Sequence, residues 1–222
     1  MTIAAGLDVA RYGNDLCAFA VIDDLHLVAL DEWAKTGLMD TATRARDMAL
    51  AHGVQMLAVD DTGVGGGVTD RLIQMLEEDL EDGEEADLLI LPVNFGSAAD
   101  DAKRFHNKAS EMWWRGREAL DPAEEERLRL PAHHKLRDRL TMQLASALYR
   151  KDATGRIWVE KDGERSRRPG DPPAPSPDLA DAVMLAMEAW SQFWEAEGQQ
   201  TETRYFRPSF LGRSAGQAFM EE

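Results

Sequence analysis

Residues 3–33 read IAAGLDVARYGNDLCAFAVIDDLHLVALDEW, and they contain three short, mostly apolar runs separated by polar turns. The runs cover residues 3–10, 15–22 and 26–33. Arg11-Tyr12-Gly13-Asn14 marks the first turn, and Asp23-Asp24 makes a tight connection between the second and third runs. Short apolar runs bounded by turn residues are typical of β-strands, and short connections join antiparallel neighbours. The segment therefore predicts a three-strand antiparallel meander.

The rest of the chain alternates between helical and strand patterns. VQMLAVD at 54–60 and LLILPV at 88–93 are nearly all apolar, which is typical of parallel strands covered on both faces. Helices are expected over about 40–52, 68–80, 101–120, 133–150 and from Pro177 to about Glu195, with a short strand at 156–160. This order predicts an α/β fold, in which a mixed sheet of an antiparallel meander plus parallel strands carries helices on both faces.

The composition bounds the class of protein. The 222 residues are 44% hydrophobic, which suits a folded globular domain. Cys17 is the single cysteine, so an intramolecular disulfide framework and a cysteine-based zinc site are excluded. No apolar run approaches the roughly 20 residues of a membrane span, and the N-terminus does not resemble a signal peptide. We expect a soluble intracellular domain at 1–197, a polar and flexible tail at 198–222, and no membrane partner.

Charge is distributed unevenly along the chain. The 41 acidic and 25 basic residues give a formal net charge of −16, which disfavours nucleic-acid binding if the charge is evenly spread. Eight acids and no base lie between Glu77 and Asp87, whereas basic residues gather at Lys103–Arg117 and Arg165–Arg168. For a nucleic-acid partner, these two basic segments are the expected contact surface, and the acidic segment is expected to face away.

Four carboxylates stand where predicted strands end or the last helix begins. Asp8 is near the end of the first strand, and Asp60 closes the strand at 54–60. Asp178 and Asp181, three residues apart, share one face of the last helix. If the first and fourth strands are neighbours and this helix packs across them, the four carboxylates converge. Such a set suits hard cations, Mg²⁺ or Mn²⁺, and two ions can hold both oxygens of a phosphodiester displacement.

Each of these residues also has a purely structural explanation. Asp8 can end a strand, Asp60 can cap the following glycine loop, and Asp178 can complement the helix dipole, whereas Asp181 lies too far into the helix for that role. The loop Gly63-Val64-Gly65-Gly66-Gly67 lacks the Gly-Lys-Ser/Thr of a P-loop, and a valine stands at the third glycine position of a dinucleotide fingerprint. We interpret it as a tight strand-to-helix turn.

Four segments together resemble the nuclease domain of the bacteriophage large terminase subunit, a ribonuclease-H-like, RuvC-like fold. The segments are GLDVARYGND at 6–15, VDDTGVGGGVTDRL at 59–72, FHNKASEMWW at 105–114 and SPDLADAVMLAM at 176–187. The resemblance implies that Asp8, Asp60 and Asp181 are metal-binding acids and that Asp178 is the extra acid of RuvC-like members. It further implies an accessory role for Asp15 and makes Lys161 the lysine common on the hairpin before the last helix. The run GDPPAPSPD into that helix is longer than is usual in the family.

The resemblance implies an Mg²⁺- or Mn²⁺-dependent endonuclease that cuts double-stranded DNA during phage genome packaging, by a two-metal reaction in the cytoplasm of the infected host. Its implied partners are a packaging ATPase domain, the portal and the small terminase subunit. No Walker A sequence is present, so the chain is expected to be either an isolated nuclease domain or a stand-alone relative. The alternatives are a RuvC-like Holliday junction resolvase, a non-catalytic packaging adaptor, and an actin-like nucleotide binder, for which the chain leaves little room.

Overall fold

The computed structural model describes residues 2–200 except 11–15, 35, 84–86 and 162–175. Its centre is a five-stranded sheet in the order β3-β2-β1-β4-β5. The strands are β1 (Ile3–Asp8), β2 (Cys17–Asp23), β3 (His26–Trp33), β4 (Met56–Asp60) and β5 (Leu89–Val93). Strands β1, β2 and β3 pair antiparallel, whereas β4 runs parallel to β1 and β5 parallel to β4. The predicted mixed sheet, with its antiparallel meander, is confirmed.

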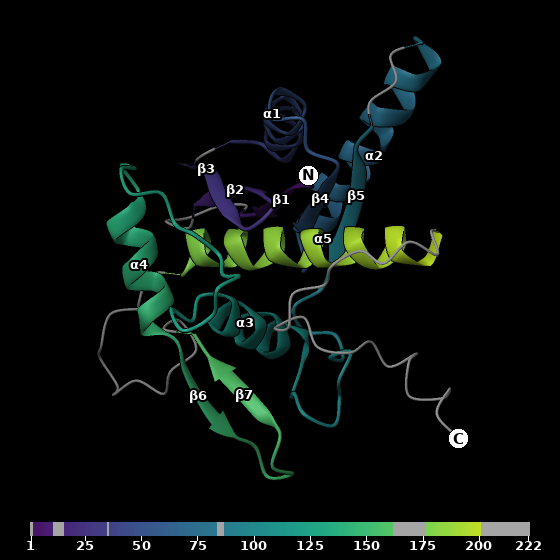
Figure 1. Ribbon diagram of the computed structural model, residues 1–222. Helices are drawn as coiled ribbons and strands as arrows, with labels where there is room; N and C mark the ends of the chain where they lie inside the picture. The colour runs from purple at the N-terminus through teal and green to yellow at the C-terminus, as the bar shows by residue number, and fades with distance from the viewer. Residues whose placement is uncertain (1, 11–15, 35, 84–86, 162–175, 201–222) are drawn as a thin grey trace, which may run out of the picture.

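Helices cover both faces of this sheet, as predicted (Figure 1). Helices α1 (Leu38–Ala51) and α2 (Gly65–Glu81) cover one face, and the long α5 (Asp178–Gln200) crosses the other. Alternate residues of β1 therefore serve two separate cores: Ala5 and Leu7 pack with α1 and α2, and Ala4 packs with α5. Because both faces are buried, the central strands are apolar throughout rather than alternating.

Glycine at position 6 allows an unusually close approach between β1 and α5. A Cβ at this position would lie 2.1 Å from the carbonyl oxygen of Ala182 and 2.4 Å from the backbone nitrogen of Ala186. The start of α5 is thereby held directly against β1, two residues before the strand ends at Asp8.

The segment between β5 and α5 differs from the prediction. The helix expected over 101–120 begins only at α3 (Lys108–Ala119), where the Asn107 side chain accepts the N–H of Ser110. The helix expected over 133–150 is shorter, α4 (Arg137–Ser146), because Leu148 already belongs to β6 (Leu148–Lys151), which pairs antiparallel with β7 (Ile157–Glu160). Leucine recurs at every fourth position beyond the end of the helix, but the last of these leucines, Leu148, is a strand residue because it pairs with β7.

Two predicted features fall partly outside the described residues. Helix α5 continues to Gln200, past the expected boundary after residue 197, and the rest of the expected tail, 201–222, lies outside the described residues. Most of the basic, proline-rich segment 163–177 also lies outside the described residues, and so does Asp15. Among the residues described, no helix has the length and apolar character needed to cross a membrane.

Candidate active site

The sheet and α5 bring the four predicted carboxylates to one end of the fold. Asp8 ends β1 and Asp60 ends the parallel neighbour β4, with Leu7 and Val59 in register just before them. Asp178 and Asp181 lie in the first turn of α5, which packs across β1. The charges of Asp181, Asp178 and Asp60 all act on Asp8, so these side chains are electrostatic neighbours.

Asp181 has the most elaborate surroundings of the four. Its side chain is buried, and its Oδ1 accepts hydrogen bonds from the indole N–H of Trp113 at 2.8 Å and from Lys161 Nζ at 2.8 Å. Lys161 Nζ is also 2.7 Å from Oδ2. Lys161 directly follows β7, so the hairpin lysine that the resemblance singled out does reach the carboxylates. The sequence did not show that Trp113 bonds to Asp181. A tryptophan that only fills the core and a tryptophan that donates its indole N–H to a carboxylate look the same in a sequence.

Asp178 and Asp60 each accept a backbone hydrogen bond. Asp178 Oδ2 accepts the N–H of Leu16 at 3.2 Å, which ties the start of β2 to α5. Asp60 Oδ1 accepts the N–H of Thr62 at 3.0 Å, the geometry of the capping role expected of Asp60 on purely structural grounds. This contact engages only one of the two carboxylate oxygens, so capping does not exclude a second role.

Crowding of like charges marks the site electrostatically. Burial is the main cause that raises the pKa of Asp8 well above its usual value, and the negative charges of Asp181, Asp178 and Asp60 add to it, while Lys161 opposes them. Burial likewise raises the pKa of Asp60, against the hydrogen bonds from Thr62. Such a set is costly to ionise without a compensating cation.

The donor set can be compared with the needs of a divalent cation. In the part of the chain that the structure describes, no three His, Cys, Asp or Glu side chains form a group that could hold a metal ion as they stand. The ammonium of Lys161 lies against both oxygens of Asp181, in the place where a cation would approach them. The chemistry of the donors nevertheless fits Mg²⁺ or Mn²⁺, because all four side chains are carboxylates whose like charges repel one another where they crowd.

The glycine loop forms the tight strand-to-helix turn predicted for it. Gly63 has a φ of +64°, and α2 begins at Gly65. A Cβ at position 65 would lie 1.7 Å from the carbonyl oxygen of Asp60, so only glycine lets α2 start this close to the end of β4. The loop thus fixes the backbone that carries Asp60.

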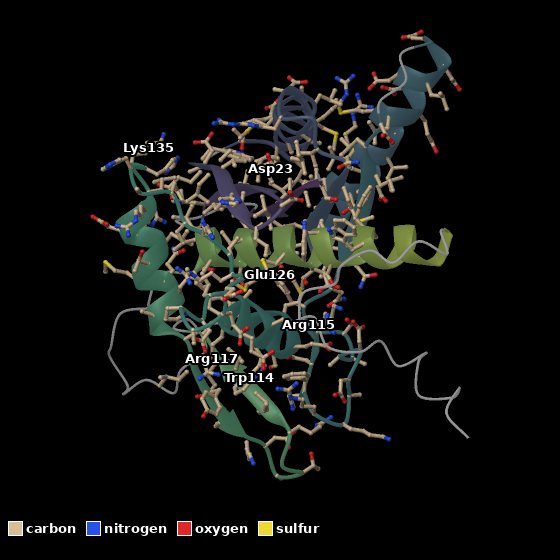
Figure 2. The ribbon with its side chains drawn as sticks, viewed as in Figure 1. Asp23, Trp114, Arg115, Arg117, Glu126 and Lys135 are labelled. Carbon is tan, nitrogen blue, oxygen red and sulfur yellow. The ribbon has the colours of Figure 1, made fainter. Side chains whose placement is uncertain are left out.

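The first basic segment is a weaker contact surface than the sequence suggested. Lys108 is buried and bonded to Asp100 and Glu188, and Arg115 pairs with Glu111, so both cations belong to an internal ion-pair network. They were expected to face a partner, but both also lie within ion-pair distance of Glu188 on α5, which turns them inward. Figure 2 labels Arg115, Arg117 and Trp114, which all come from α3 and lie below α5 in this view. The second segment, Arg165–Arg168, lies outside the described residues.

Comparison with known proteins extends these observations. No protein-family model and no curated protein matches the chain. Among solved structures, the nuclease domain of the large terminase subunit gp2 of bacterial virus Sf6 is 17% identical, with a TM-score of 0.72 over 84% of this chain and 88% of that one. The large terminase nuclease of thermophilic phage G20c is 14% identical, with a TM-score of 0.56 over 84% and 81% of the two chains.

Further structures agree with these. The large terminase nuclease domain of Thermus phage P74-26 is 15% identical, with a TM-score of 0.53 over 93% of this chain and 84% of that one. Structures of the Sf6 domain with manganese and of the G20c nuclease with magnesium are among the similar ones. The chain therefore has the ribonuclease-H-like fold of the nuclease domains of phage large terminase subunits.

Proposed function

We propose that this protein is a metal-dependent endonuclease that cuts double-stranded DNA during phage genome packaging. The observation that carries the proposal is the placement of Asp8 and Asp60 at the ends of adjacent parallel strands, with Asp178 and Asp181 in the first turn of the helix that crosses them. A fold shared with terminase nuclease domains supports the same activity class.

In this proposal the metal ligands are Asp8, Asp60, Asp178 and Asp181, which would hold two Mg²⁺ or Mn²⁺ ions. Bound there, the ions would supply a nucleophilic hydroxide near neutral pH and stabilise the charge that develops at the scissile phosphate. The chain itself contributes the crowded negative charges around Asp8, which a bound cation would relieve, and the ammonium of Lys161, which is close enough to balance their charge or a phosphate's.

The proposal extends to partners and location. The cutting activity would belong to residues 1–197 and would operate in the cytoplasm of the infected host, together with a packaging ATPase domain, the portal and the small terminase subunit. A net charge of −16 opposes tight DNA binding, so attachment to that machinery would supply the local DNA concentration. Backbone contacts would position the duplex with little sequence preference.

A plasmid-cleavage assay with Mg²⁺ or Mn²⁺ tests the activity. Asp60→Asn and Asp181→Asn should each abolish cutting, since each removes a ligand, and Asp60→Asn should also leave the fold intact because it relieves like-charge repulsion. Asp138→Asn is the matched control, because this side chain on α4 is 97% exposed. Cutting by either site variant at the parental rate would refute the proposed site.

Two further measurements separate the alternatives. Calorimetry should detect Mn²⁺ binding that is firmer than Mg²⁺ binding, whereas tight Zn²⁺ binding without an Mn²⁺ response would contradict an oxygen-only site. A comparison of linear duplex with a four-way junction should show cutting of the duplex. A strict preference for the junction would identify a resolvase, and metal binding without any cutting would point to a packaging adaptor.

A further inference from the structure

The indole N–H of Trp113 is the feature of the site that the proposed chemistry leaves unexplained. Trp113 belongs to α3 and Asp181 to α5, and the two side chains, 5% and 4% exposed, meet in a 2.8 Å hydrogen bond. We propose that Trp113 is a positioning residue that fixes the orientation of the Asp181 carboxylate for metal binding. This inference rests on the proposed function, because it gives Asp181 the role of a metal ligand.

The two donors on Asp181 differ in what they can fix. Lys161 ends a long, flexible side chain whose ammonium can leave the carboxylate without disturbing the backbone. Trp113 is rigid, its N–H can only donate, and a buried donor requires an acceptor. The indole therefore holds Oδ1 in one direction, and the lone pairs that remain stay available to a cation that takes the place of Lys161. Hydrogen bonds of this kind orient metal ligands in proteins generally.

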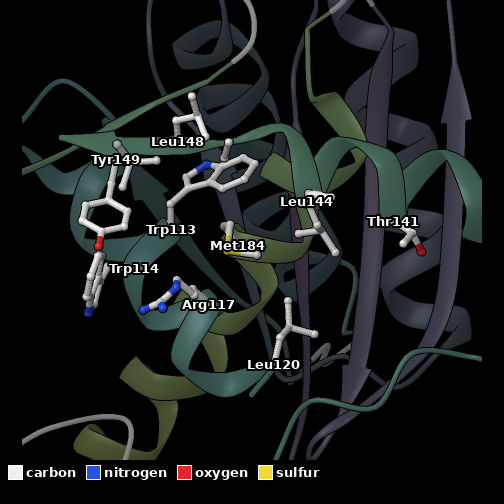
Figure 3. A pocket seen from close by; sticks show the side chains of 12 residues that line it. Trp113, Trp114, Arg117, Leu120, Thr141, Leu144, Leu148, Tyr149 and Met184 are labelled. Carbon is white, nitrogen blue, oxygen red and sulfur yellow. The ribbon is translucent and has the colours of Figure 1, made fainter. Parts of the chain in front are cut away.

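The buried Trp113 ring is not enclosed by packed side chains on every side. The ring also lines a cavity of about 330 Å³ between α3, α4, β6 and α5, whose other walls include Leu144, Leu148 and Met184 (Figure 3). A side chain that borders open volume has room to move. The bond to Asp181 consequently fixes the indole as well as the carboxylate. Loss of either side chain should therefore change the position of the other.

The neighbouring residue provides a matched control. Trp114 lies on the same helix, lines the same cavity, and also donates its indole N–H to a carboxylate, that of Glu118, at 2.6 Å. Glu118 is on the same helix, four residues further along the chain, and is not one of the four site acids. Trp113→Phe and Trp114→Phe therefore remove the same atoms next to the same cavity, and only the first removes a donor to Asp181.

Calorimetric titration of the full chain with Mn²⁺ compares the two variants. Trp113→Phe should weaken Mn²⁺ binding by roughly 10- to 100-fold, the usual effect of losing a hydrogen bond to a metal ligand. Trp114→Phe should leave the affinity unchanged. Equal affinities in the parent and in Trp113→Phe, or equal losses in the two variants, would overturn the positioning role.

Indole N–H resonances give a second readout that requires no activity. The chain has six tryptophans, and the two variants identify the resonances of Trp113 and Trp114 by their disappearance. In the metal-free protein, Asp181→Asn should shift the Trp113 resonance and leave that of Trp114 in place. An unmoved Trp113 resonance would overturn the inference, and sequential assignment of the parent protein identifies that resonance even if Trp113→Phe fails to fold.

Titration with diamagnetic Mg²⁺ separates this inference from the proposed function. Saturation should shift the Trp113 resonance and leave that of Trp114 unmoved. Metal binding that shifts neither resonance would overturn the positioning role and leave the nuclease proposal standing. A parent protein that binds neither Mg²⁺ nor Mn²⁺ would overturn the nuclease proposal and, with it, the positioning of a ligand.

Discussion

Replacement of Gly6 by alanine should separate the two halves of the site. A Cβ at this position would lie 2.1 Å from the carbonyl oxygen of Ala182, 2.4 Å from the nitrogen of Ala186 and 2.7 Å from the Cβ of Leu185. These atoms belong to the backbone of α5 or are attached directly to it, so no rotation of a side chain can relieve the contacts. The whole helix must move away from β1.

The size of the effect follows from these distances. Carbon and oxygen atoms pack at about 3.5 Å, so α5 must shift by about 1 Å or more. Overpacking of this kind costs about 1–3 kcal/mol, and a contact with backbone belongs at the upper end. The shift also carries Asp178 and Asp181 away from Asp8, and a 1 Å misplacement in a catalytic site can cost about 100-fold in rate.

Urea unfolding and plasmid cleavage would measure the two effects, with Gly116→Ala as the control. A Cβ at position 116 would also meet an atom at 2.1 Å, but that atom is Sδ of Met184, near the flexible end of a side chain that borders the cavity. Met184 has room to move, and alanine favours a helix over glycine by about 1 kcal/mol. We expect Gly116→Ala to be close to neutral. Parental stability and cleavage in Gly6→Ala, or equal losses in both variants, would refute the reasoning.

Three further predictions concern the metal-free protein and the glycine turn. The pKa of Asp8 is higher in the folded than in the unfolded chain. Its stabilising contribution is therefore present below about pH 4 and is lost as the pH rises through the folded pKa. Asp8→Asn should then unfold at a higher urea concentration than the parent at pH 7, but not below about pH 4. Lys161→Ala breaks the buried pair with Asp181 and should cost about 3–5 kcal/mol in urea unfolding without metal. Arg150→Ala, which removes an exposed ion pair, should cost less than about 1 kcal/mol, and similar losses in both would contradict the burial argument. Gly65→Ala should destabilise the fold and impair cleavage together, because the new Cβ meets the backbone carbonyl at the end of β4; a soluble, fully active variant would show that α2 can shift freely.

The strands and the acids could be predicted because their signals are local. A strand such as 54–60 is buried on both faces, so its apolar run is continuous, and Asp60 interrupts the run where the strand ends. The ends of α3 and α4 could not be predicted in the same way. Leu148 has a helical spacing, but it forms β6 because its backbone pairs with Glu160, and no local pattern records that partner.

The sequence by itself determined the mixed sheet, the helices on both faces and the strand ends that carry Asp8 and Asp60, because periodicity and turn residues act over a few neighbours. The parallel pairing of β1 with β4, which brings these two acids together, was decided by the tertiary structure. Tertiary structure alone decided that Lys108 and Arg115 turn inward toward Glu188 of α5, and that Trp113 bonds to Asp181, 68 residues away. Each of those contacts joins residues whose encounter depends on how α3 packs against α5. The sequence shows which polar side chains are present, whereas the packing of α3 against α5 determines which of them form hydrogen bonds and ion pairs with one another.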